Sequence, residues 1–380
     1  MSSANSPPSS ATTAPALRYV SDEIPGLSRL RKGQSFRYRD SEGRWITDEN
    51  EIERIKKLAI PPAYTSVWIC PWPNGHLQAT GVDARGRKQY RYHPQWQEAR
   101  DESQFERLEA FSLALPRIRA HVARDLVPLR GAPLSRTVVL ATLVRLLDTT
   151  LVRVGNEAYL RSNGSYGLTT LRAPHVGVSG SVLQLRFRGK SGVLHDVSLD
   201  DPRVAKVVRR CQQLPGQELF QYLDEDGQTH ALGSSEVNDY IAEAAGARFT
   251  AKDFRTWHGT VQALDLTRET YLHPAEEDFN PQKMLEEVAG LLGNTPAVCR
   301  KAYIHPAVLA LATEMAADPT FTHTTDATWR RLASIQSQRR LSAAEGRLQT
   351  FLQLNRRDTR LQRTAAKPRA ARALRQAEPV

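Results

Sequence analysis

The sequence predicts an α+β protein in which a small β-rich region precedes a mostly helical domain that contains a β-hairpin. Residues 18–101 hold short strand-like runs, such as TSVWICPW and HLQATGV, between prolines and glycines. From residue 102 onward the patterns become helical. Two alternating runs interrupt them, LQLRFR and VLHDVSL, on either side of Gly189-Lys190-Ser191.

Before the β-rich region, residues 1–17 are rich in Ser, Thr, Pro and Ala, which predicts a disordered tail. Within that region, the segment GVDARGRKQYRYH predicts a tight turn followed by a strand. The strand places Lys88, Tyr90 and Tyr92 on one face and Gln89 and Arg91 on the other. Basic, aromatic and amide side chains in this order suit DNA phosphates and base edges. An ordinary hairpin with a solvated charged face is an equal alternative.

The helical region begins with a long apolar segment, SRTVVLATLVRLLDTTLVRVG, in which Ser135 is the expected N-cap and Gly155 the stop. A second helix, in FTAKDFRTWHGTVQALDL, has Thr250 as expected N-cap and Asp253 three residues later. Its apolar residues share one helical face: Phe254, Trp257, Val261 and Leu264.

A helix in PQKMLEEVAGLLG should end at Gly293, and the next begins with Thr295 as cap and Pro296 at its first position. We expect Pro306 to end that short helix, which puts Tyr303 near its terminus. Two amphipathic helices follow residue 326, the second with Ser342 and Glu345 as a capping box.

The predicted organisation is therefore a tail (1–17), a β-rich domain (18–101), a larger domain (102–325), a helical extension (326–355) and a basic tail (356–380). The last segment carries eight basic and two acidic residues, which is typical of a nonspecific polyanion-binding arm.

The charge of the whole chain points the same way. Lys and Arg number 52 against 41 Asp and Glu, giving a net charge of +11 over 380 residues. Such an excess favours a nucleic acid partner, with an acidic membrane surface or a merely basic protein as alternatives.

No apolar run has membrane-spanning length, and the uncharged N-terminus lacks the apolar centre of a signal peptide, so we expect a cytoplasmic protein. Cys70, Cys211 and Cys299 are odd in number and widely spaced, which argues against disulfides and a cysteine-based zinc site.

The hairpin lysine resembles the end of an ATP-binding loop. That loop needs a glycine at residue 184, which is Gln184, and a following helix, whereas a strand pattern follows here. The ATP interpretation is therefore excluded. A lysine at a hairpin tip is commonly solvated, but it could also reach a scissile phosphate as a general acid.

Arg153, Arg255 and Tyr303 are further candidates for chemistry. The planar arginine fork can donate two hydrogen bonds to the nonbridging oxygens of a transferring phosphoryl group. A tyrosine with its ordinary pKa near 10 needs cations around it to become a nucleophile. Each has a structural alternative, Arg255 as a surface helix residue and Tyr303 as a core aromatic, and spacing alone does not bring the three together.

Six segments in order give a more specific indication: GVDARGRKQYRY, LVRVGNEAY, YGLTTLRAPHV, RFRGKSG, KDFRTWHGT and NTPAVCRKAYIHP. Together they resemble the type IB DNA topoisomerases, in particular the compact branch of poxviruses and bacteria, from about Pro61 to Leu309. The resemblance implies a β-rich N-terminal DNA-binding domain and a helical catalytic domain. It also implies a monomer that clamps around duplex DNA, associated with the nucleoid if the source is bacterial.

The resemblance also implies a catalytic set. Tyr303 would be the nucleophile, Arg153 and Arg255 the two arginines, and Lys190 the general acid. Many members carry histidine nine positions before the tyrosine, where this chain has Asn294; an amide can donate a hydrogen bond but adds no charge, so we expect weaker stabilisation. The expected DNA-contacting residues are Arg87, Lys88, Gln89, Tyr90, Tyr92 and Tyr159.

The implied reaction is supercoil relaxation through a DNA-3′-phosphotyrosyl intermediate, with neither ATP nor a metal cofactor. A tyrosine recombinase is the nearest alternative, but recombinases usually carry histidine where this chain has Lys252, and their N-terminal domain is helical. A non-enzymatic basic DNA-binding protein is the second alternative.

Overall fold

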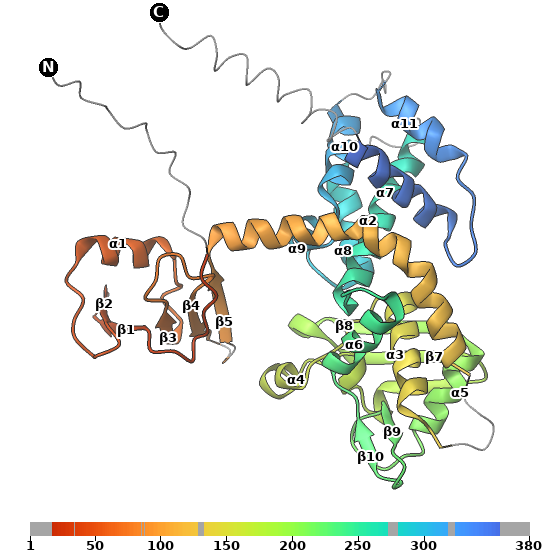
Figure 1. Cartoon of the computed structure of the whole chain (residues 1–380), viewed down its shortest axis with the longest axis horizontal. Helices are drawn as coiled ribbons and strands as arrows, with labels where there is room; N and C mark the ends of the chain where they lie inside the picture. The colour runs from red at the N-terminus through yellow and green to blue at the C-terminus, as the bar shows by residue number, and fades with distance from the viewer. Residues whose placement is uncertain are drawn as a thin grey trace, which may run out of the picture. The chain divides into compact units, whose positions relative to one another are not determined.

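The computed structural model describes residues 17–33, 35–84, 86, 88–127, 133–272, 280–317 and 324–357. The chain forms two compact units, the first ending at Glu102 and the second beginning at Ser103 (Figure 1). The predicted N-terminal tail, apart from Leu17, and the basic tail beyond Arg357 lie outside the described residues.

The first unit is built on an antiparallel sheet with the strand order β2-β1-β3-β4-β5. Its strands are β1 (Leu27–Lys32), β2 (Ser35–Arg39), β3 (Thr65–Ile69), β4 (Leu77–Val82) and β5 (Lys88–Tyr92), and α1 (Glu49–Lys57) lies between β2 and β3 in the chain. Ile55 of α1 packs with Val67 and Ile69 of β3 in the core of this unit. The predicted β-rich N-terminal region is confirmed.

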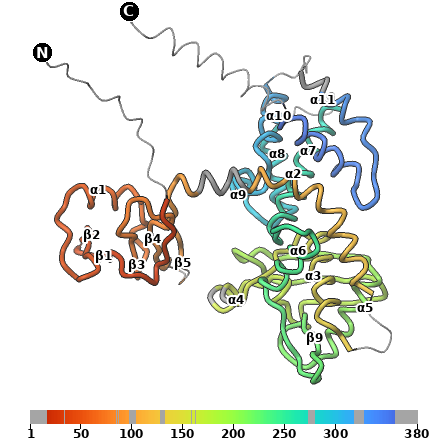
Figure 2. The backbone as a smooth tube through the Cα atoms, in the orientation of Figure 1, coloured from red at the N-terminus to blue at the C-terminus, as the bar shows by residue number. Residues whose placement is uncertain are grey.

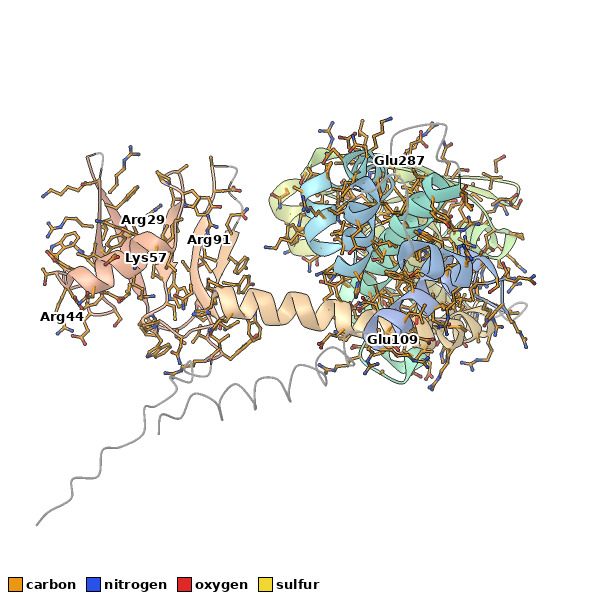
Figure 3. The ribbon with its side chains drawn as sticks, turned by 90° about the horizontal axis from the view of Figure 1, so that it is seen from above. Arg29, Arg44, Lys57, Arg91, Glu109 and Glu287 are labelled. Atoms are coloured by element: carbon orange, nitrogen blue, oxygen red, sulfur yellow. The ribbon has the colours of Figure 1, made fainter. Side chains whose placement is uncertain are left out.

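Two arginine side chains form hydrogen bonds between this sheet and the loop before β3. The Arg29 guanidinium donates to the carbonyls of Ile60, Pro61 and Tyr64 at 2.9, 2.9 and 2.8 Å. Arg91 donates to the Ala59 carbonyl at 3.0 Å. Figure 3 shows both arginines. Backbone carbonyls outside the sheet ladder thereby obtain hydrogen-bond partners.

The second unit is largely helical, as predicted. Its helices are α2 (Pro94–Asp125, which also crosses the unit boundary), α3 (Arg136–Thr150), α4 (Glu157–Asn163), α5 (Pro202–Cys211), α6 (Ser234–Ala245), α7 (Ala251–Leu272), α8 (Pro281–Leu292), α9 (Pro296–Ala302), α10 (Pro306–Ala317) and α11 (Thr324–Ala333), followed by a helix over residues 343–357. Phe254 and Trp257 of α7 are fully buried, and Phe111 of α2 packs edge-on against both. Helix α7 thus runs through the core of the unit (Figure 2).

The predicted hairpin consists of β7 (Val182–Arg188) and β8 (Leu194–Asp200), and β6 (Val176–Ser179) adds a third antiparallel strand. Leu183, Leu185 and Phe187 are buried, as the alternation predicts. The tip is a short 3-10 turn over Lys190–Gly192. A separate pair, β9 (Gln221–Leu223) and β10 (Thr229–Ala231), forms a two-stranded sheet.

Two helix boundaries differ from the predictions. Helix α3 stops at Thr150 instead of reaching Gly155, because Leu151 takes the left-handed conformation, with φ of 56°. Arg153 therefore lies in the loop after the helix. Pro306 begins α10 instead of ending α9, which stops at Ala302, because proline lacks an N–H that the first helical position does not need. The predicted starts of α7 and α9, at Thr250 and Thr295, are confirmed.

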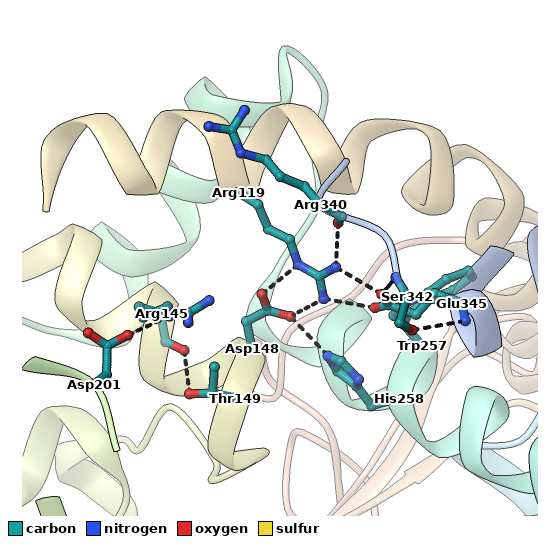
Figure 4. Close-up of polar contacts among 10 residues, drawn as sticks. All are labelled: Arg119, Arg145, Asp148, Thr149, Asp201, Trp257, His258, Arg340, Ser342 and Glu345. Carbon is teal, nitrogen blue, oxygen red and sulfur yellow. Dashed lines mark hydrogen bonds and ion pairs between the residues drawn. The ribbon is translucent and has the colours of Figure 1, made fainter. Parts of the chain in front are cut away.

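The predicted capping box at the last helix is present. The Ser342 N–H donates to Glu345 Oε2 at 2.8 Å, and the Glu345 N–H donates to Ser342 Oγ at 3.2 Å. Glu345 also accepts from Arg119 of α2 at 2.7 Å and from the Trp257 indole of α7 at 3.1 Å (Figure 4). The helix over residues 343–357 is thus tied to α2 and α7 through one carboxylate.

Arg119 completes this network by binding a second carboxylate, Asp148 of α3, at 2.7 and 2.8 Å. Asp148 also contacts His258 of α7 at 3.0 Å (Figure 4). Burial would raise the pKa of Asp148, but the hydrogen bonds from Arg119 and His258 lower it well below its usual range. The two carboxylates are therefore ionised and share one arginine, which joins α2, α3 and the helix over residues 343–357; the carboxylates in turn bind His258 and Trp257 of α7.

Candidate active site

Arg255 is a buried cation, with 4% of its surface exposed. From α7 its guanidinium donates to the carbonyl of Leu151, and to that of Leu292 at 2.7 Å. These carbonyls belong to the residue just after α3 and the last residue of α8. The alternative that Arg255 is a surface helix residue is therefore wrong; both ends of its planar fork are fixed.

Tyr303 lies directly beside this cation. The Arg255 guanidinium carbon is 5.1 Å from the centroid of the Tyr303 ring. Burial alone would raise the pKa of the phenol, but the charge and hydrogen bond of Arg255, followed by the charges of Arg153 and Lys252, lower it overall. The surroundings of Tyr303 thus favour the phenolate.

The backbone of Tyr303 is held by α7. Its carbonyl accepts from Thr260 Oγ1 at 3.2 Å, and the same hydroxyl accepts from the N–H of His305 at 3.2 Å. A Cβ added to Gly259 would lie 2.8 Å from the Tyr303 carbonyl oxygen, so this close approach depends on glycine.

Arg153 and Asn294 form a second polar group. Arg153 Nη2 donates to Asn294 Oδ1, and to the Gly293 carbonyl at 3.3 Å. Burial and the charge of Arg255 lower the pKa of Arg153. Arg153 Nη1 and Asn294 Nδ2 are buried donors that form no hydrogen bond of good geometry with the described residues, although Tyr303 lies close to Arg153 and the Cys299 thiol close to Asn294. A bound anion could satisfy both.

Lys190 is exposed at the hairpin tip, and its Nζ lies 5.3 Å from the centroid of the Tyr159 ring. Tyr159, on α4, is 51% exposed. The lysine thus sits beside an aromatic face at a distance typical of a cation–π contact.

A cavity of about 260 Å³ brings these side chains together. Its walls include Arg153, Lys190, Arg255 and Tyr303, together with Tyr159, Tyr166 and Lys252. Asn294 reaches the group through its hydrogen bond to Arg153. Residues separated by up to 150 positions in the sequence thus converge, with four cationic side chains and three tyrosines lining one space.

Residues 93–320, which contain this whole group, match the family model of the eukaryotic DNA topoisomerase I catalytic core. Residues 35–83 match the bacterial DNA topoisomerase IB N-terminal domain. The chain belongs to the type IB DNA topoisomerases. Members of this family are isomerases, and the family confirms both the resemblance and the α+β fold expected from the sequence.

Viral type IB topoisomerases are among its relatives. The chain is 33% identical over 291 residues to DNA topoisomerase 1B of Acanthamoeba polyphaga mimivirus, covering 74% of this chain and 85% of the viral protein. It is 24% identical over 289 residues to DNA topoisomerase 1B of Vaccinia virus (strain Copenhagen) and to DNA topoisomerase I of Monkeypox virus, covering 73% of this chain and 85% of each.

The other predicted DNA-contacting residues belong to the first unit of this topoisomerase, on the edge strand β5. Lys88 pairs with Asp22 at 2.5 Å, and Gln89 donates to Asp83 at 2.9 Å. The rings of Tyr90 and Tyr92 stack with centroids 6.1 Å apart, on the face that also carries Lys88. Arg87 lies outside the described residues.

Several polar residues around the site were not predicted from the sequence, and Lys252 and Gln104 are two of them. Lys252 lines the cavity, one helical turn before Arg255, so its spacing of three residues was a usable signal. Gln104 accepts from Lys252 and donates to the carbonyl of Ala302, next to Tyr303, at 2.8 Å. Gln104 is 198 residues from Ala302, and no local pattern indicates that contact.

In the part of the chain that the structure describes, no helix has the length and apolar character needed to cross a membrane. Nor does any group of three or more His, Cys, Asp and Glu side chains there have an arrangement suited to a metal ion.

Proposed function

We propose that this type IB topoisomerase relaxes supercoiled duplex DNA by cutting one strand through Tyr303, allowing rotation, and resealing the strand. The observation that carries the proposal is the convergence of Arg153, Lys190, Arg255 and Tyr303 on one cavity. This is the set of groups that attack on a phosphodiester requires: a nucleophile, an acid for the leaving oxygen, and cations for the developing charge.

In the cleavage step, the phenol of Tyr303 loses its proton to solvent water and its oxygen attacks phosphorus. A phosphorus–oxygen bond to Tyr303 forms while the bond to the 5′ oxygen breaks, leaving a DNA-3′-phosphotyrosyl link and a free 5′-hydroxyl. The lowered pKa of Tyr303 supports its role as nucleophile. Lys190, assisted by Arg153, donates the proton that the 5′ oxygen takes up.

Arg255 and Asn294 hold the nonbridging oxygens as negative charge builds up. Arg255 suits this role because its position is fixed by two backbone carbonyls before any substrate arrives. Asn294 has an unused buried Nδ2 donor for the same purpose. Its amide replaces a charge with a dipole, so a smaller contribution is expected from Asn294 than from Arg255.

Resealing runs the same steps in reverse, with Lys190 now accepting the proton of the 5′-hydroxyl. The phosphotyrosyl bond conserves the energy of the phosphodiester, so the cycle requires no ATP. The net charge of +11 is consistent with a DNA partner. We expect one copy of the chain to hold the duplex, with contacts from Lys88, Gln89, Tyr90, Tyr92 and Tyr159.

The decisive test is relaxation of supercoiled plasmid in EDTA without ATP. Wild type should relax the plasmid, and Tyr303→Phe should not. Tyr222→Phe removes a hydroxyl from a tyrosine outside the cavity and is the matched control, expected to remain active. Activity in Tyr303→Phe would remove Tyr303 as nucleophile, and a wild type that is inactive in EDTA would contradict the metal-free mechanism.

A further inference from the structure

His195 of β8 lies between the two backbone turns that carry Lys190 and Asn294. A Cβ added to Gly189, the residue before Lys190, would lie 2.6 Å from Cδ2 and from Nε2 of His195. A Cβ added to Gly293, the residue before Asn294, would lie 2.9 Å from Cε1 of His195. The imidazole therefore fills the space that a side chain at either glycine would need, with the two neighbouring ring edges that meet at Nε2.

The position of this ring is set by the hairpin. His195 is the cross-strand partner of Phe187, and the two rings stack with centroids 4.9 Å apart and planes 12° from parallel. Phe187 is itself buried in the core. The imidazole is thus supported by the core on one face and has little freedom to move.

The Gly293 turn is in turn joined to the catalytic candidates. Arg153 donates to the Gly293 carbonyl at 3.3 Å and to the side chain of Asn294. Gly293 has φ of 59°, a conformation that glycine adopts without strain. A rigid path therefore runs from the Lys190 turn through His195 to the group that contains Arg153.

We propose that His195 is a positioning residue for DNA cleavage, whose ring sets the distance between the Lys190 turn and the Gly293–Asn294 turn. This inference rests on the proposed function, and in particular on Lys190 as the acid. With the ring removed, the tip could tilt into the vacated space, and Lys190 would no longer reach the 5′ oxygen.

The charge state of the ring fits this role. Burial lowers the pKa of His195, and the positive charges of Arg153 and Arg255 lower it further. The neutral imidazole adds no third cation to this cluster, so the ring acts through its shape. A phenylalanine ring should therefore replace it, whereas a small side chain should not.

The test compares single-turnover cleavage of two DNA substrates, one normal and one with a 5′-bridging phosphorothiolate, whose sulfur leaves without a proton. His195→Ala should slow cleavage of the normal substrate at least tenfold and recover most of the rate on the phosphorothiolate. His195→Phe should cleave both at close to the wild-type rate. His195→Leu, which refills the space without a flat ring, should show the pattern of His195→Ala with a smaller loss and serves if His195→Ala does not fold.

Lys190→Ala, measured in parallel, distinguishes the role of Lys190 as general acid from the role of His195 in positioning it. If Lys190→Ala is not rescued by the phosphorothiolate, the general-acid role fails, and the proposal for His195 fails with it. If Lys190→Ala is rescued while the His195 variants are equally slow on both substrates, Lys190 keeps its role and His195 is not its positioning residue. A His195→Ala variant with the wild-type rate on the normal substrate also overturns the proposal.

Discussion

The guanidinium of Arg255 lies 5.1 Å from the centroid of the Tyr303 ring, and its nitrogens are bound to the carbonyls of Leu151 and Leu292. One side chain thus joins the end of α3, the end of α8 and the candidate nucleophile. A lysine at this position would keep the charge but lose the fork that meets both carbonyls.

We therefore expect Arg255→Lys to cleave DNA roughly 100-fold more slowly, the order of loss seen when a fixed donor to a developing anion is removed. Single-turnover cleavage and DNA binding should be measured together, because the loss should fall on the rate of cleavage. A variant that binds poorly yet cleaves at the normal rate once bound would show that Arg255 acts in binding instead.

The charge of Arg255 should also be visible in the titration of Tyr303. Because Arg255 lowers the pKa of the phenol, Arg255→Gln should raise it, so that less phenolate is present near neutral pH. The ratio of the wild-type cleavage rate to that of Arg255→Gln should therefore become smaller as the pH rises. The shift can be measured directly by following the phenolate absorbance of Arg255→Gln as the pH is raised. The double variant Arg255→Gln with Tyr303→Phe, titrated in the same way, gives the absorbance of the other tyrosines. Arg268→Gln, on the same helix, should leave the titration unchanged.

Gly259 provides a test of the packing behind Tyr303. Replacing a helical glycine with alanine ordinarily stabilises a protein by about 1 kcal/mol. At Gly259 the new Cβ would meet the Tyr303 carbonyl oxygen at 2.8 Å, so Gly259→Ala should destabilise by about 1 to 3 kcal/mol and reduce cleavage. Gly290→Ala in α8 has open space around its Cβ and should be stabilising. Urea unfolding of both variants measures the two changes in stability. If Gly259→Ala raises the free energy of unfolding as much as Gly290→Ala does, the close contact at Gly259 is refuted.

Glu345 is 4% exposed and accepts from Arg119 and Trp257. Glu345→Gln removes one of the two carboxylates that bind Arg119, while the ion pair between Arg119 and Asp148 remains. The free energy of unfolding should therefore fall by about 2 kcal/mol. Glu314→Gln, at an exposed position of α10, should change it little. Denaturant unfolding of the pair measures the difference, and similar values for both variants would mean that the buried network adds no stability.

His305 should make stability depend on acid. Burial lowers its pKa from 6.5 to about 4, so the folded chain takes up its proton at lower pH than the unfolded chain. Its contribution is complete above pH 6.5 and is lost as the pH falls toward 4, at a cost of up to about 3 kcal/mol. His305→Asn can still accept the Ala307 N–H but does not titrate in this window. Its stability should fall less than that of wild type between pH 7 and pH 4; identical losses would contradict the assignment.

Local patterns predicted much of the fold. Signals that involve only a few neighbouring residues were predicted correctly. They are the caps at Thr250 and Thr295, the capping box of Ser342 and Glu345, and the strand alternation on both sides of Lys190. The strands β1 and β2 were not predicted individually, and neither was β6. The end of α3 was also misplaced, because it depends on the backbone of Leu151, whose carbonyl is taken by an arginine 104 residues away.

The candidate site shows the same division between local and distant information. Residue types and their order led to the resemblance, and the family match is now established. Residue types and spacing did not show that Arg153 would bind Asn294, or that Gln104 would hold the residue next to Tyr303, since these contacts cross 141 and 198 positions. His195 was not predicted, because its proposed role depends on its contacts with Gly189 and Gly293, which come together only in the folded chain.

The link between Arg119 and Glu345 has a consequence for how the chain is made. A ribosome that has just added Arg119 must move 226 positions further before it reaches Glu345. During that interval Arg119 and Asp148 are present without the second carboxylate, and Trp257 without its hydrogen-bond acceptor. The helical unit therefore completes its core only after the segment beyond residue 340 has been synthesised, because Leu348, Phe351 and Leu352 of that segment are buried in it.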